Sequence, residues 1–528
     1  MTSLVRALDE NAERYAGRTA CAVGPDCLSY AELRDTSCRV ATGLLDLGLL
    51  PGDRVSLYLP NCAAYVSCYF AAMRAGMIAN PINSVFTAAE VEYLLRDSGA
   101  AALVTTPGLA ARLADVLPRT GVRAVICTDD ALAGGPAGGP AGGGAERLRL
   151  ADLLATPPRP LPYPGDTLTA CLPYSSGTTG RSKGIEHSHH SLAMQAVLSA
   201  NHLQMRPADV LVQALPLVHL YPGNIIMGGL LTAGATMVVQ PVFDPPAFAE
   251  LLAEQHATAC AGVPTTYAML CQLDEKVVSG LDLSGLQIAC SAGAPLPSRV
   301  RSEFRRIFGC RILDCYGITE AAGNLTATLR FGDTPEQSCG VPYPLTEVRI
   351  VDADDADVPA GEVGELIARG PQIMGGYWNR PAETQATLRG GWLHTGDLAR
   401  QDDSGFFYIV DRAKDVILSG GYNVYPAEIE EVLQSHPDVA MCACFGVADA
   451  IKGEKPWAAV VLRAGAQADE AGLDRHCRRS LAAYKVPRRF LVVDELPRSS
   501  VGKILRRELR AVFGAQASTQ ATAHEGAR

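Results

Sequence analysis

The sequence predicts an α/β protein with a large N-terminal domain of several subdomains and a small α+β domain at the C-terminal end. Three observations support this fold class: a length of 528 residues, short apolar runs that alternate with helical patterns, and a change to closely spaced strands after residue 346. A chain of this length exceeds one typical domain, so at least two are expected. Strand and helix patterns that alternate are typical of sheets covered by helices.

Composition narrows the class of protein before any motif is considered. Hydrophobic residues make up 48% of the chain and charged residues 19%, which is typical of a globular enzyme. The net charge of −10 argues against general nucleic-acid binding. The sixteen cysteines include no C-x-x-C pair, which favours reduced, buried thiols in a cytoplasmic protein. The N-terminus carries acids and no apolar run reaches about 18 residues, so neither a signal peptide nor a membrane span is expected.

The first part of the chain shows the strand pattern of an α/β domain. Residues 133–145, AGGPAGGPAGGGA, form a low-complexity stretch that predicts a surface linker. Beyond it, TLTACLPY leads into a loop, and ATMVVQP, LQIACSAG and RILDCYG each end at a Gly or Pro turn. These runs predict strands whose loops gather at the strand ends.

The pattern changes twice toward the C-terminus. Between residues 346 and 411, short runs separated by Gly and Asp turns predict antiparallel hairpins. From there, PAEIEEVLQS and EAGLDRHCRRSLAAYK predict helices, and AMCACFGV and PWAAVVL predict strands. We therefore expect an N-terminal domain over 1–413, a C-terminal domain over 414–512 and a disordered tail over 513–528.

The stretch YSSGTTGRSKG, residues 174–184, has the composition of a phosphate-binding loop. It departs from the usual G-x-x-x-x-G-K-[ST] spacing, because Ser182 precedes Lys183 and Gly184 follows it. Its hydroxyl groups and glycines nevertheless offer a concave row of hydrogen-bond donors that suits phosphate oxygens. The alternative is an ordinary polar loop after a strand.

Two further motifs supply the other groups that a nucleotide site needs. CYGITEAAG, residues 315–323, places Thr319 beside Glu320, a phosphate donor beside a hard oxygen ligand for magnesium. Tyr316 precedes them and can stack on a flat base. In GWLHTGDLAR, Asp397 follows a Gly turn and can accept both ribose hydroxyls. The alternative for Asp397 is a plain turn residue.

Five motifs stand in order along the chain: YSSGTTGRSKG, CYGITEAAG, GWLHTGDLA, DRAKDVILSGGYNVYPAEIEE and PRSSVGKILRREL. Over residues 10–512 the chain closely resembles the adenylate-forming superfamily of acyl-CoA synthetases, coumarate–CoA ligases, luciferases and peptide-synthetase adenylation domains. The resemblance implies a large N-terminal domain and a small mobile C-terminal domain. It also implies a two-step reaction that uses ATP, Mg²⁺ and coenzyme A. A carboxylate attacks the α-phosphate of ATP, pyrophosphate leaves, and a nucleophile then captures the acyl-adenylate.

The resemblance also implies roles by position. For the nucleotide, these are Thr178, Thr179 and Lys183 in the phosphate loop, Gly293, Ala294 and Pro295 beside the adenine with Tyr316, Thr319 at the α-phosphate, Glu320 at magnesium, and Asp397 and Arg412 at the ribose. For the remaining steps, these are His219 as a gate of the acyl site, Lys414 as the hinge, Gly421 and Tyr422 beside the pantetheine tunnel, and Lys503 between the carboxylate and the α-phosphate. A positioned ammonium and Mg²⁺ offset the repulsion between the two reacting anions.

The acceptor and the acid remain as alternatives at this stage. A carboxylic acid–CoA ligase is favoured, because GGYNVYPAEIEE resembles the members that use coenzyme A. A stand-alone enzyme that loads a carrier protein or forms an amide is the alternative, and a non-enzymatic binding protein is the third possibility. The segments expected to line the acyl pocket, 218–225 and 315–324, contain no Arg or Lys. An apolar fatty, aryl or cyclic acid is therefore expected rather than a second carboxylate.

Overall fold

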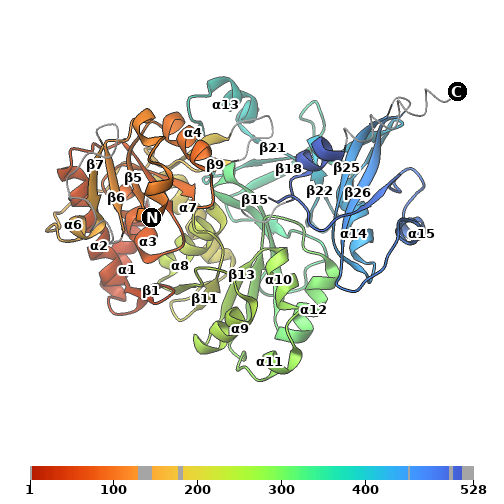
Figure 1. The fold of residues 1–528 in the computed structure, drawn as a ribbon, viewed down its shortest axis with the longest axis horizontal. Helices are drawn as coiled ribbons and strands as arrows, with labels where there is room; N and C mark the ends of the chain where they lie inside the picture. The colour runs from red at the N-terminus through yellow and green to blue at the C-terminus, as the bar shows by residue number, and fades with distance from the viewer. Residues whose placement is uncertain (1–2, 129–144, 176–181, 450–451, 499–503, 514–528) are drawn as a thin grey trace.

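The structure is a computed structural model that describes residues 3–128, 145–175, 182–449, 452–498 and 504–513. Within these residues the chain forms two large mixed sheets, one smaller antiparallel sheet and a separate sheet near the C-terminal end. Figure 1 shows a large body coloured red to green and a smaller blue lobe beside it. The predicted class, an α/β protein with a large N-terminal and a smaller C-terminal domain, is confirmed.

The first large sheet has a parallel centre whose strands are buried on both faces, as parallel strands usually are. Its strands in spatial order are β20 (Gly376–Tyr377), β10 (Lys183–Ser188), β8 (Thr169–Cys171), β4 (Ile78–Asn83), β3 (Arg54–Leu59), β5 (Ala100–Thr105), β6 (Ala124–Cys127) and β7 (Glu146–Arg149), with β9 (Tyr174–Ser175) paired to β10. Helices α4 (Ala88–Ser98) and α5 (Pro107–Arg112) pack on its outer face. A capping box between Thr87 and Glu90 fixes the start of α4.

The second large sheet contains the strands predicted from ATMVVQP, LQIACSAG and RILDCYG, which are β12, β14 and β15. Its order is β17 (Val341–Pro342), β16 (Gly323–Ala327), β15 (Arg311–Ile318), β14 (Ile288–Ser291), β13 (Ala259–Gly262), β11 (Val210–Gln213), β12 (Thr236–Val239), β1 (Thr19–Val23) and β2 (Asp26–Ser29). The outer face is covered by α9 (Pro245–Glu254), α10 (Pro264–Leu270), α11 (Glu275–Ser279) and α12 (Ser298–Phe308).

The largest hydrophobic core lies between these two sheets. It is formed by α1 (Leu4–Arg14), α2 (Tyr30–Asp46), α3 (Ala63–Arg74), α6 (Leu150–Leu154), α7 (His189–His202) and α8 (Met227–Ala233), together with the inner faces of both sheets. Arg74 is 8% exposed and donates two hydrogen bonds to Asp9, at 3.0 and 2.6 Å. A paired and hydrogen-bonded charge of this kind is tolerated inside a core. The core holds the two sheets as one body.

The hairpins predicted between residues 346 and 411 form a four-stranded antiparallel sheet. Its strands are β18 (Glu347–Val351), β19 (Gly364–Arg369), β21 (Leu393–Gln401) and β22 (Phe407–Arg412). The sequence did not predict the short helix α13 (Pro381–Thr387), which stands between β20 and β21 and begins at a proline. Figure 1 shows α13 near α4 at the top of the molecule. An ion pair between Arg380 and Asp97 at 3.3 Å joins the two regions.

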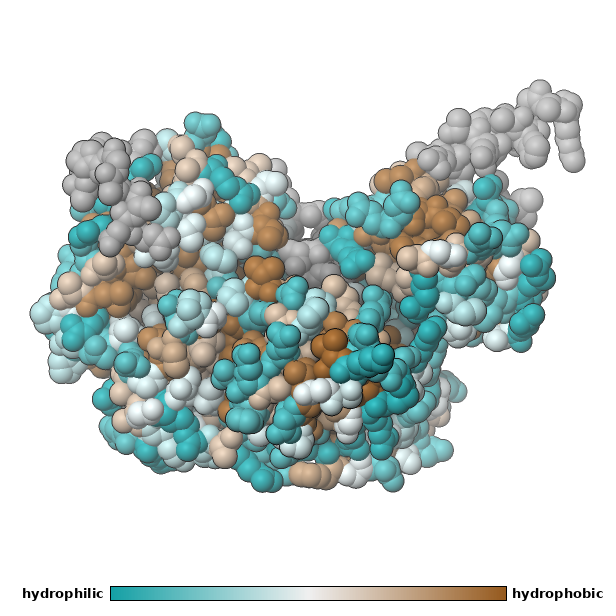
Figure 2. All heavy atoms as spheres, turned by 60° about the horizontal axis from the view of Figure 1, so that its bottom comes forward, coloured by the Kyte–Doolittle hydropathy of each residue, from teal (hydrophilic) through white to brown (hydrophobic). Residues whose placement is uncertain are grey.

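The C-terminal lobe is a small α+β unit, as predicted. Its sheet contains β24 (Tyr422–Val424), β23 (Ile417–Ser419), β26 (Gly453–Leu462), β25 (Val439–Asp449) and β27 (Phe490–Val492). Helix α14 (Pro426–Gln434) and helix α15 (Glu470–Ser480) pack on it around one core. The helix expected over 470–485 ends at Ser480, because Leu481 is extended, with φ −111° and ψ 142°. Figure 2 shows the surface hollowed between the large body and this lobe.

Three further expectations concern the Gly-rich linker and the C-terminal tail, the state of the cysteines, and membrane-spanning helices. The Gly-rich linker 133–145 lies almost wholly outside the described residues, and so does the expected tail beyond Phe513. All sixteen cysteines are described, and none of them forms a disulfide. None of the helices in the described ranges has the length and apolar character needed to cross a membrane.

Candidate functional site

The candidate site lies at one edge of the second sheet, where neighbouring parallel strands end. Strands β14 and β15 run parallel with Ser291 opposite Asp314, so the turns that follow them lie at the same edge. The turn after β14 holds the exposed residues Gly293, Ala294 and Pro295. Gly293 has φ +88°, a conformation that glycine adopts without strain. Open α/β sheets bind their ligands at this kind of edge.

Tyr316, Asp397 and Arg412 form one hydrogen-bonded group at this edge. Asp397 on β21 lies directly opposite Arg412 on β22. The Tyr316 hydroxyl donates to Oδ2 of Asp397 at 2.8 Å, and Nε of Arg412 lies 3.2 Å from Oδ1. Asp397 is 4% exposed, so Arg412 rather than bulk water offsets its charge. Burial raises the pKa of Tyr316, which keeps the phenol a neutral donor. The bond from Tyr316 to Asp397 was not predicted.

Thr319 and Glu320 stand in a short helical turn, η4 (Thr319–Ala321), directly after β15. The ring Nε2 of His187 lies 2.7 Å from the Thr319 carbonyl. Burial lowers the pKa of His187 to about 4, so the ring is neutral and donates this hydrogen bond. On the other side of the turn, the Tyr377 hydroxyl donates to Oε1 of Glu320 at 2.9 Å. The turn is therefore fixed from two strands of the first sheet, β10 and β20.

Lys183 opens β10 and lies in the same group of side chains. Its ammonium forms an ion pair with Glu383 on α13. It also lies 5.0 Å from the centroid of the Tyr377 ring, a distance at which cation–π attraction contributes. Burial raises the pKa of Tyr377, and the neighbouring Glu320 carboxylate raises it further. Tyr377 thus joins the predicted phosphate-loop cation to the predicted magnesium ligand.

Both ends of the predicted phosphate loop are held by α4. The Tyr174 hydroxyl donates to Oδ2 of Asp97 at 2.8 Å, and the Tyr93 hydroxyl donates to the Ser182 carbonyl at 2.7 Å. Strand β9 pairs with β10 in a hairpin in which Gly184 lies opposite Tyr174. The loop residues Thr178 and Thr179 lie outside the described residues. What the structure describes is the base of the loop, which stands beside Glu320 and α13.

His219 lies on the far side of the site, in the turn before the π-helix η3 (Tyr221–Ile226). Its Nε2 is 3.3 Å from Nδ2 of Asn83, and burial lowers its pKa to about 4. The Asn224 amide donates to the Ala322 carbonyl at 3.0 Å. This bond joins the two segments expected to line the acyl pocket. Single turns of π-helix often mark functional sites.

Residues of these two segments join other residues in an apolar cluster. It contains Leu198, Ala292, Cys315, Ala327, Tyr343 and the partly buried Tyr221. The Tyr221 hydroxyl donates to the Cys290 carbonyl at 3.0 Å, so the polar tip of this ring is already paired.

Gly421 and Tyr422 stand apart from this edge, in the C-terminal lobe. Gly420 and Gly421 form the two-residue turn between β23 and β24, with φ +60° and +85°. Positive φ at both positions is typical of a type I′ hairpin, and it accounts for the two glycines. Tyr422 is 58% exposed and stacks on Tyr484, with ring centroids 4.6 Å apart. The structure does not bring this hairpin to the nucleotide edge.

Lys503 lies outside the described residues, but the chain on both sides of it is described. Arg498 pairs with Ile504 in an isolated β-bridge. Arg506 donates to Oε2 of Glu430 on α14 at 2.7 Å and lies 3.6 Å from Asp415, next to the expected hinge residue Lys414. The chain that follows Lys503 is therefore anchored through Arg506 both to α14 and to the start of the C-terminal lobe.

Tyr377, Glu383 and His187 belong to the site but were not among the residues predicted for it. They become neighbours of the motif residues through the antiparallel pairing of β10 with β20, where Glu186 lies opposite Gly376. Pairing between distant strands leaves no local periodicity in a sequence. The available signal is the run GGYW before a proline-started helix, which marks a short edge strand.

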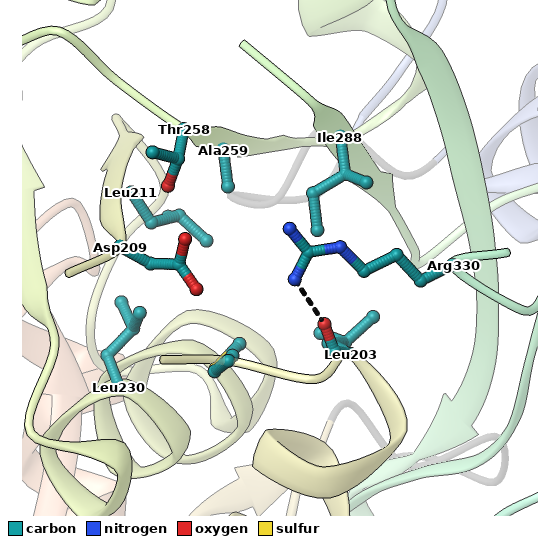
Figure 3. A pocket seen from close by; sticks show the side chains of 9 residues that line it. Leu203, Asp209, Leu211, Leu230, Thr258, Ala259, Ile288 and Arg330 are labelled. Atoms are coloured by element: carbon teal, nitrogen blue, oxygen red, sulfur yellow. Dashed lines mark hydrogen bonds between the residues drawn. The ribbon is translucent and has the colours of Figure 1, made fainter. Parts of the chain in front are cut away.

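A small cavity at the opposite edge of the second sheet is too small to hold a nucleotide. It lies near the amino ends of β11, β13 and β14 and has room for about one water molecule. Figure 3 shows the buried Arg330 turned toward the Leu203 carbonyl, across the cavity from Asp209. Arg330 also donates to the Gln204 carbonyl at 2.8 Å. These carbonyls end α7, so Arg330 caps a helix.

Comparison with known proteins agrees with this geometry. The family model described as AMP-binding enzyme matches residues 8–378, and the one described as AMP-binding enzyme C-terminal domain matches residues 428–503. A long-chain-fatty-acid–CoA ligase of Escherichia coli O6:H1 is 36% identical over 96% of this chain and 94% of its own length.

Two further proteins extend the comparison to aromatic acids. A feruloyl-CoA synthase of an Amycolatopsis species is 36% identical over 94% of this chain and 96% of its own length. The crystal structure of the anthranilate CoA ligase AuaEII in complex with anthranoyl-AMP superposes with a TM-score of 0.89, at 28% identity and 98% coverage of both chains. The chain therefore belongs to the AMP-binding enzyme family, the adenylate-forming enzymes that its five motifs resemble.

Proposed function

We propose that this protein is an ATP-dependent carboxylic acid–CoA ligase that forms AMP and pyrophosphate. The observation that carries the proposal is the edge of the second sheet. There a buried carboxylate paired with a cation, Asp397 with Arg412, stands in one connected group with Tyr316, close to Thr319 and Glu320. Relatives over nearly the full length carry the names of CoA ligases for fatty and aromatic acids.

Different residues of the site would contact the ribose, the adenine and the phosphates. Asp397 has one oxygen bonded to Tyr316 and the other near Arg412, and each oxygen keeps a lone pair for a ribose hydroxyl. The exposed turn at Gly293 would lie along the adenine with Tyr316. Lys183 and Thr319 would contact the phosphates, together with Thr178 and Thr179. Each of these groups donates to or neutralises an anion.

A magnesium ion fits the donor set at Glu320. No cluster of three or more His, Cys, Asp or Glu side chains suited to a metal occurs among the described residues. Magnesium typically takes one or two protein carboxylates and fills its remaining positions with substrate phosphates and water, so one carboxylate suffices. The Tyr377 hydroxyl fixes Oε1 of Glu320 and leaves Oε2 for the ion. When bound, Mg²⁺ supplies charge neutralisation on the phosphates.

The reaction then follows from charge and position. The substrate carboxylate attacks the α-phosphate, the bond to the bridging oxygen breaks, and pyrophosphate leaves. In the second step, the thiol of coenzyme A attacks the acyl carbon and AMP leaves. We propose that Lys503 holds the carboxylate and the α-phosphate together in the first step, and that His219 borders the acyl group. A neutral ring such as that of His219 suits an apolar neighbour.

We propose that the chain divides into domains 1–413 and 414–512, with the hinge at Lys414. Lys503 and the Gly421 hairpin belong to the same proposed C-terminal domain, and one arrangement of that domain does not serve both steps. A rotation about few residues is the usual form of such a change. It would break the contacts that cross the hinge, including the bond from the Ala427 amide to Asp411 at 3.0 Å.

An apolar monocarboxylate is the proposed acid. The support is the absence of Arg and Lys from the two segments expected to line the acyl pocket, 218–225 and 315–324. A carrier protein or an amine is the second candidate acceptor. It is favoured only because enzymes that use these acceptors form the acyl-adenylate in the same first step. We also propose a cytoplasmic location, where cysteines that form no disulfide stay reduced.

An acid screen with two readouts tests this function. Pyrophosphate release is measured with fatty, aryl and cyclic acids and with dicarboxylates, and thioester formation is then measured after addition of coenzyme A. The proposal expects both readouts with apolar monocarboxylates. Pyrophosphate without a thioester would favour the carrier-protein alternative, and a clear preference for dicarboxylates would contradict the apolar pocket.

A further inference from the structure

The ion pair between Lys183 and Glu383 places a carboxylate beside the proposed triphosphate site. Lys183 is 19% exposed and Glu383 is 41% exposed, so the pair is only partly screened by solvent. Glu383 stands in the first turns of α13 and also lies 3.8 Å from Arg380. Arg380 is itself engaged with Asp97 on α4 at 3.3 Å. Lys183 is therefore the nearer and more buried of the two cations that Glu383 meets.

A carboxylate in this position acts on a triphosphate in two ways. Glu383 and a phosphate oxygen compete for the same ammonium group of Lys183, because each seeks a charge-assisted hydrogen bond from it. The carboxylate also repels the phosphate anion directly, through a medium of lower effective dielectric than water. Both effects weaken nucleotide binding, and both disappear when the Glu383 charge is removed.

Tyr377 keeps Lys183 in place independently of Glu383. Its ring centroid lies 5.0 Å from the Lys183 ammonium, and its hydroxyl is bonded to Glu320 at 2.9 Å. The ring is thus held by the turn that carries the proposed magnesium ligand. Loss of the Glu383 charge should leave the ammonium over this ring, beside the phosphate loop, because the cation–π contact remains.

We propose that Glu383 is a positioning residue that tunes affinity for ATP. It holds Lys183 in an ion pair that the triphosphate must displace, and so it keeps the KM for MgATP higher than the remaining contacts alone would set. This inference rests on the proposed nucleotide role of Lys183. A higher KM keeps the rate responsive to the concentration of ATP.

Equilibrium binding on the full chain tests the inference without turnover. The imido analogue of ATP, with nitrogen between the β- and γ-phosphates, is titrated with Mg²⁺ into wild type, Glu383→Gln, Lys183→Met and the double variant. Glu383→Gln should bind the analogue about 2- to 5-fold more tightly, a range typical of losing one partly exposed opposing charge. The gain should shrink or vanish in the Lys183→Met background, because the competition acts through Lys183.

The chain offers a closely matched control. Glu428 pairs with Lys485 in the C-terminal lobe, with exposures of 41% and 21% that nearly equal those of the first pair. Glu428→Gln should leave binding of the analogue unchanged. In turnover, Glu383→Gln should lower the KM for MgATP while the KM for the carboxylate stays the same. A general structural change would shift both constants.

The outcomes separate this inference from the function on which it rests. Unchanged or weaker binding of the analogue by Glu383→Gln, with normal binding by wild type, overturns the role of Glu383 alone. Failure of wild type to bind the analogue at all would contradict the nucleotide site itself. An equal gain in the presence and absence of Lys183 would show that Glu383 does not act through that lysine, and it too would overturn the inference.

Discussion

The nucleotide edge and the Gly421 hairpin differ in how completely their residues are assembled. At the nucleotide edge, Tyr316 and Arg412 both contact Asp397, which is 4% exposed. In the hairpin, no described atom outside Gly421 and its two chain neighbours lies within 4 Å of the position that a Cβ on Gly421 would take, and Tyr422 is 58% exposed. We propose that the nucleotide-binding groups for the first step, Lys503 excepted, are assembled within the large domain. With the proposed rotation about Lys414, the hairpin would act in a different arrangement of the lobe.

The contacts around the expected hinge fit this contrast. Asp411, at the end of the antiparallel sheet, accepts from the Ala427 amide of α14, and Gln337 is hydrogen-bonded to Glu431 of the same helix. Both bonds cross from the large body to the lobe. On the lobe side, Arg510 lies 3.8 Å from Asp415. A rotation about Lys414 would therefore exchange a few polar contacts and leave both hydrophobic cores intact.

Replacement of Lys503 should have the largest effect and would sharpen the contrast most. Lys503→Ala should slow adenylation by about 10²-fold or more, because a positioned charge at the reacting anions is lost. Capture of a supplied acyl-adenylate by coenzyme A should be much less affected. The two half-reactions are measured by pyrophosphate exchange and by reaction of synthetic adenylate with coenzyme A.

Arg507 provides the control for Lys503. It is an exposed cation close to Lys503 in the same segment, so Arg507→Ala removes a charge without removing the proposed contact. We expect nearly normal rates in both half-reactions. Equal damage to both steps by Lys503→Ala would contradict the proposal that Lys503 serves the first step alone.

A change at Asp397 tests the assembled edge itself. Asp397→Asn should lower kcat/KM for ATP by about 10- to 100-fold, since charge-assisted hydrogen bonds to the ribose are lost. It should also reduce the preference for ATP over 2′-deoxy-ATP, which is measured with both nucleotides in wild type and variant. Tyr316→Phe removes only one hydrogen bond to Asp397 and should cost less. Full retention of the preference in Asp397→Asn would place the ribose elsewhere.

The smallest expected effect is a loss of stability in acid, which can be measured for the large domain separately from the C-terminal lobe. Burial lowers the pKa of His187 and of His189 to about 4, while an unfolded chain takes up these protons near pH 6.5. The unfolded state therefore binds more protons between these values, and stability falls as the pH falls. Each histidine should cost about 1–2 kcal/mol between pH 7 and pH 5.

Tryptophan fluorescence can report this loss for the large domain alone. Trp378 and Trp392 lie in the large domain, and Trp457 lies in the lobe, so Trp457→Phe leaves only large-domain signals. The unfolding midpoint of this variant should drop between pH 7 and pH 5. Adding His187→Asn should flatten the pH dependence, because it removes a group that titrates, while the Asn amide can still donate to the Thr319 carbonyl. An unchanged slope would show that His187 does not carry the effect.

Much of the architecture was predictable, because local sequence patterns determine it. The strands β12, β14 and β15 and the hairpins after residue 346 follow from apolar runs and turn residues. The contacts of Tyr316 with Asp397 and of Lys183 with Glu383 were not predictable, since each joins segments far apart in the sequence. The short helix α13 has only seven residues, too few to show a clear helical period.

The most direct test of the contrast between the two regions is the size of the side chain at residue 421. Gly421 has φ +85°, so Gly421→Ala and Gly421→Leu carry the same backbone strain and differ only in bulk. Each enzyme is loaded with ATP and acid and then chased with coenzyme A, while acyl-AMP and thioester are quantified. We predict that both variants form acyl-AMP as wild type does, and that Gly421→Leu converts it to thioester far more slowly than Gly421→Ala. Equal rates of conversion, or loss of acyl-AMP formation in Gly421→Leu alone, would contradict the assignment of the two steps to two regions.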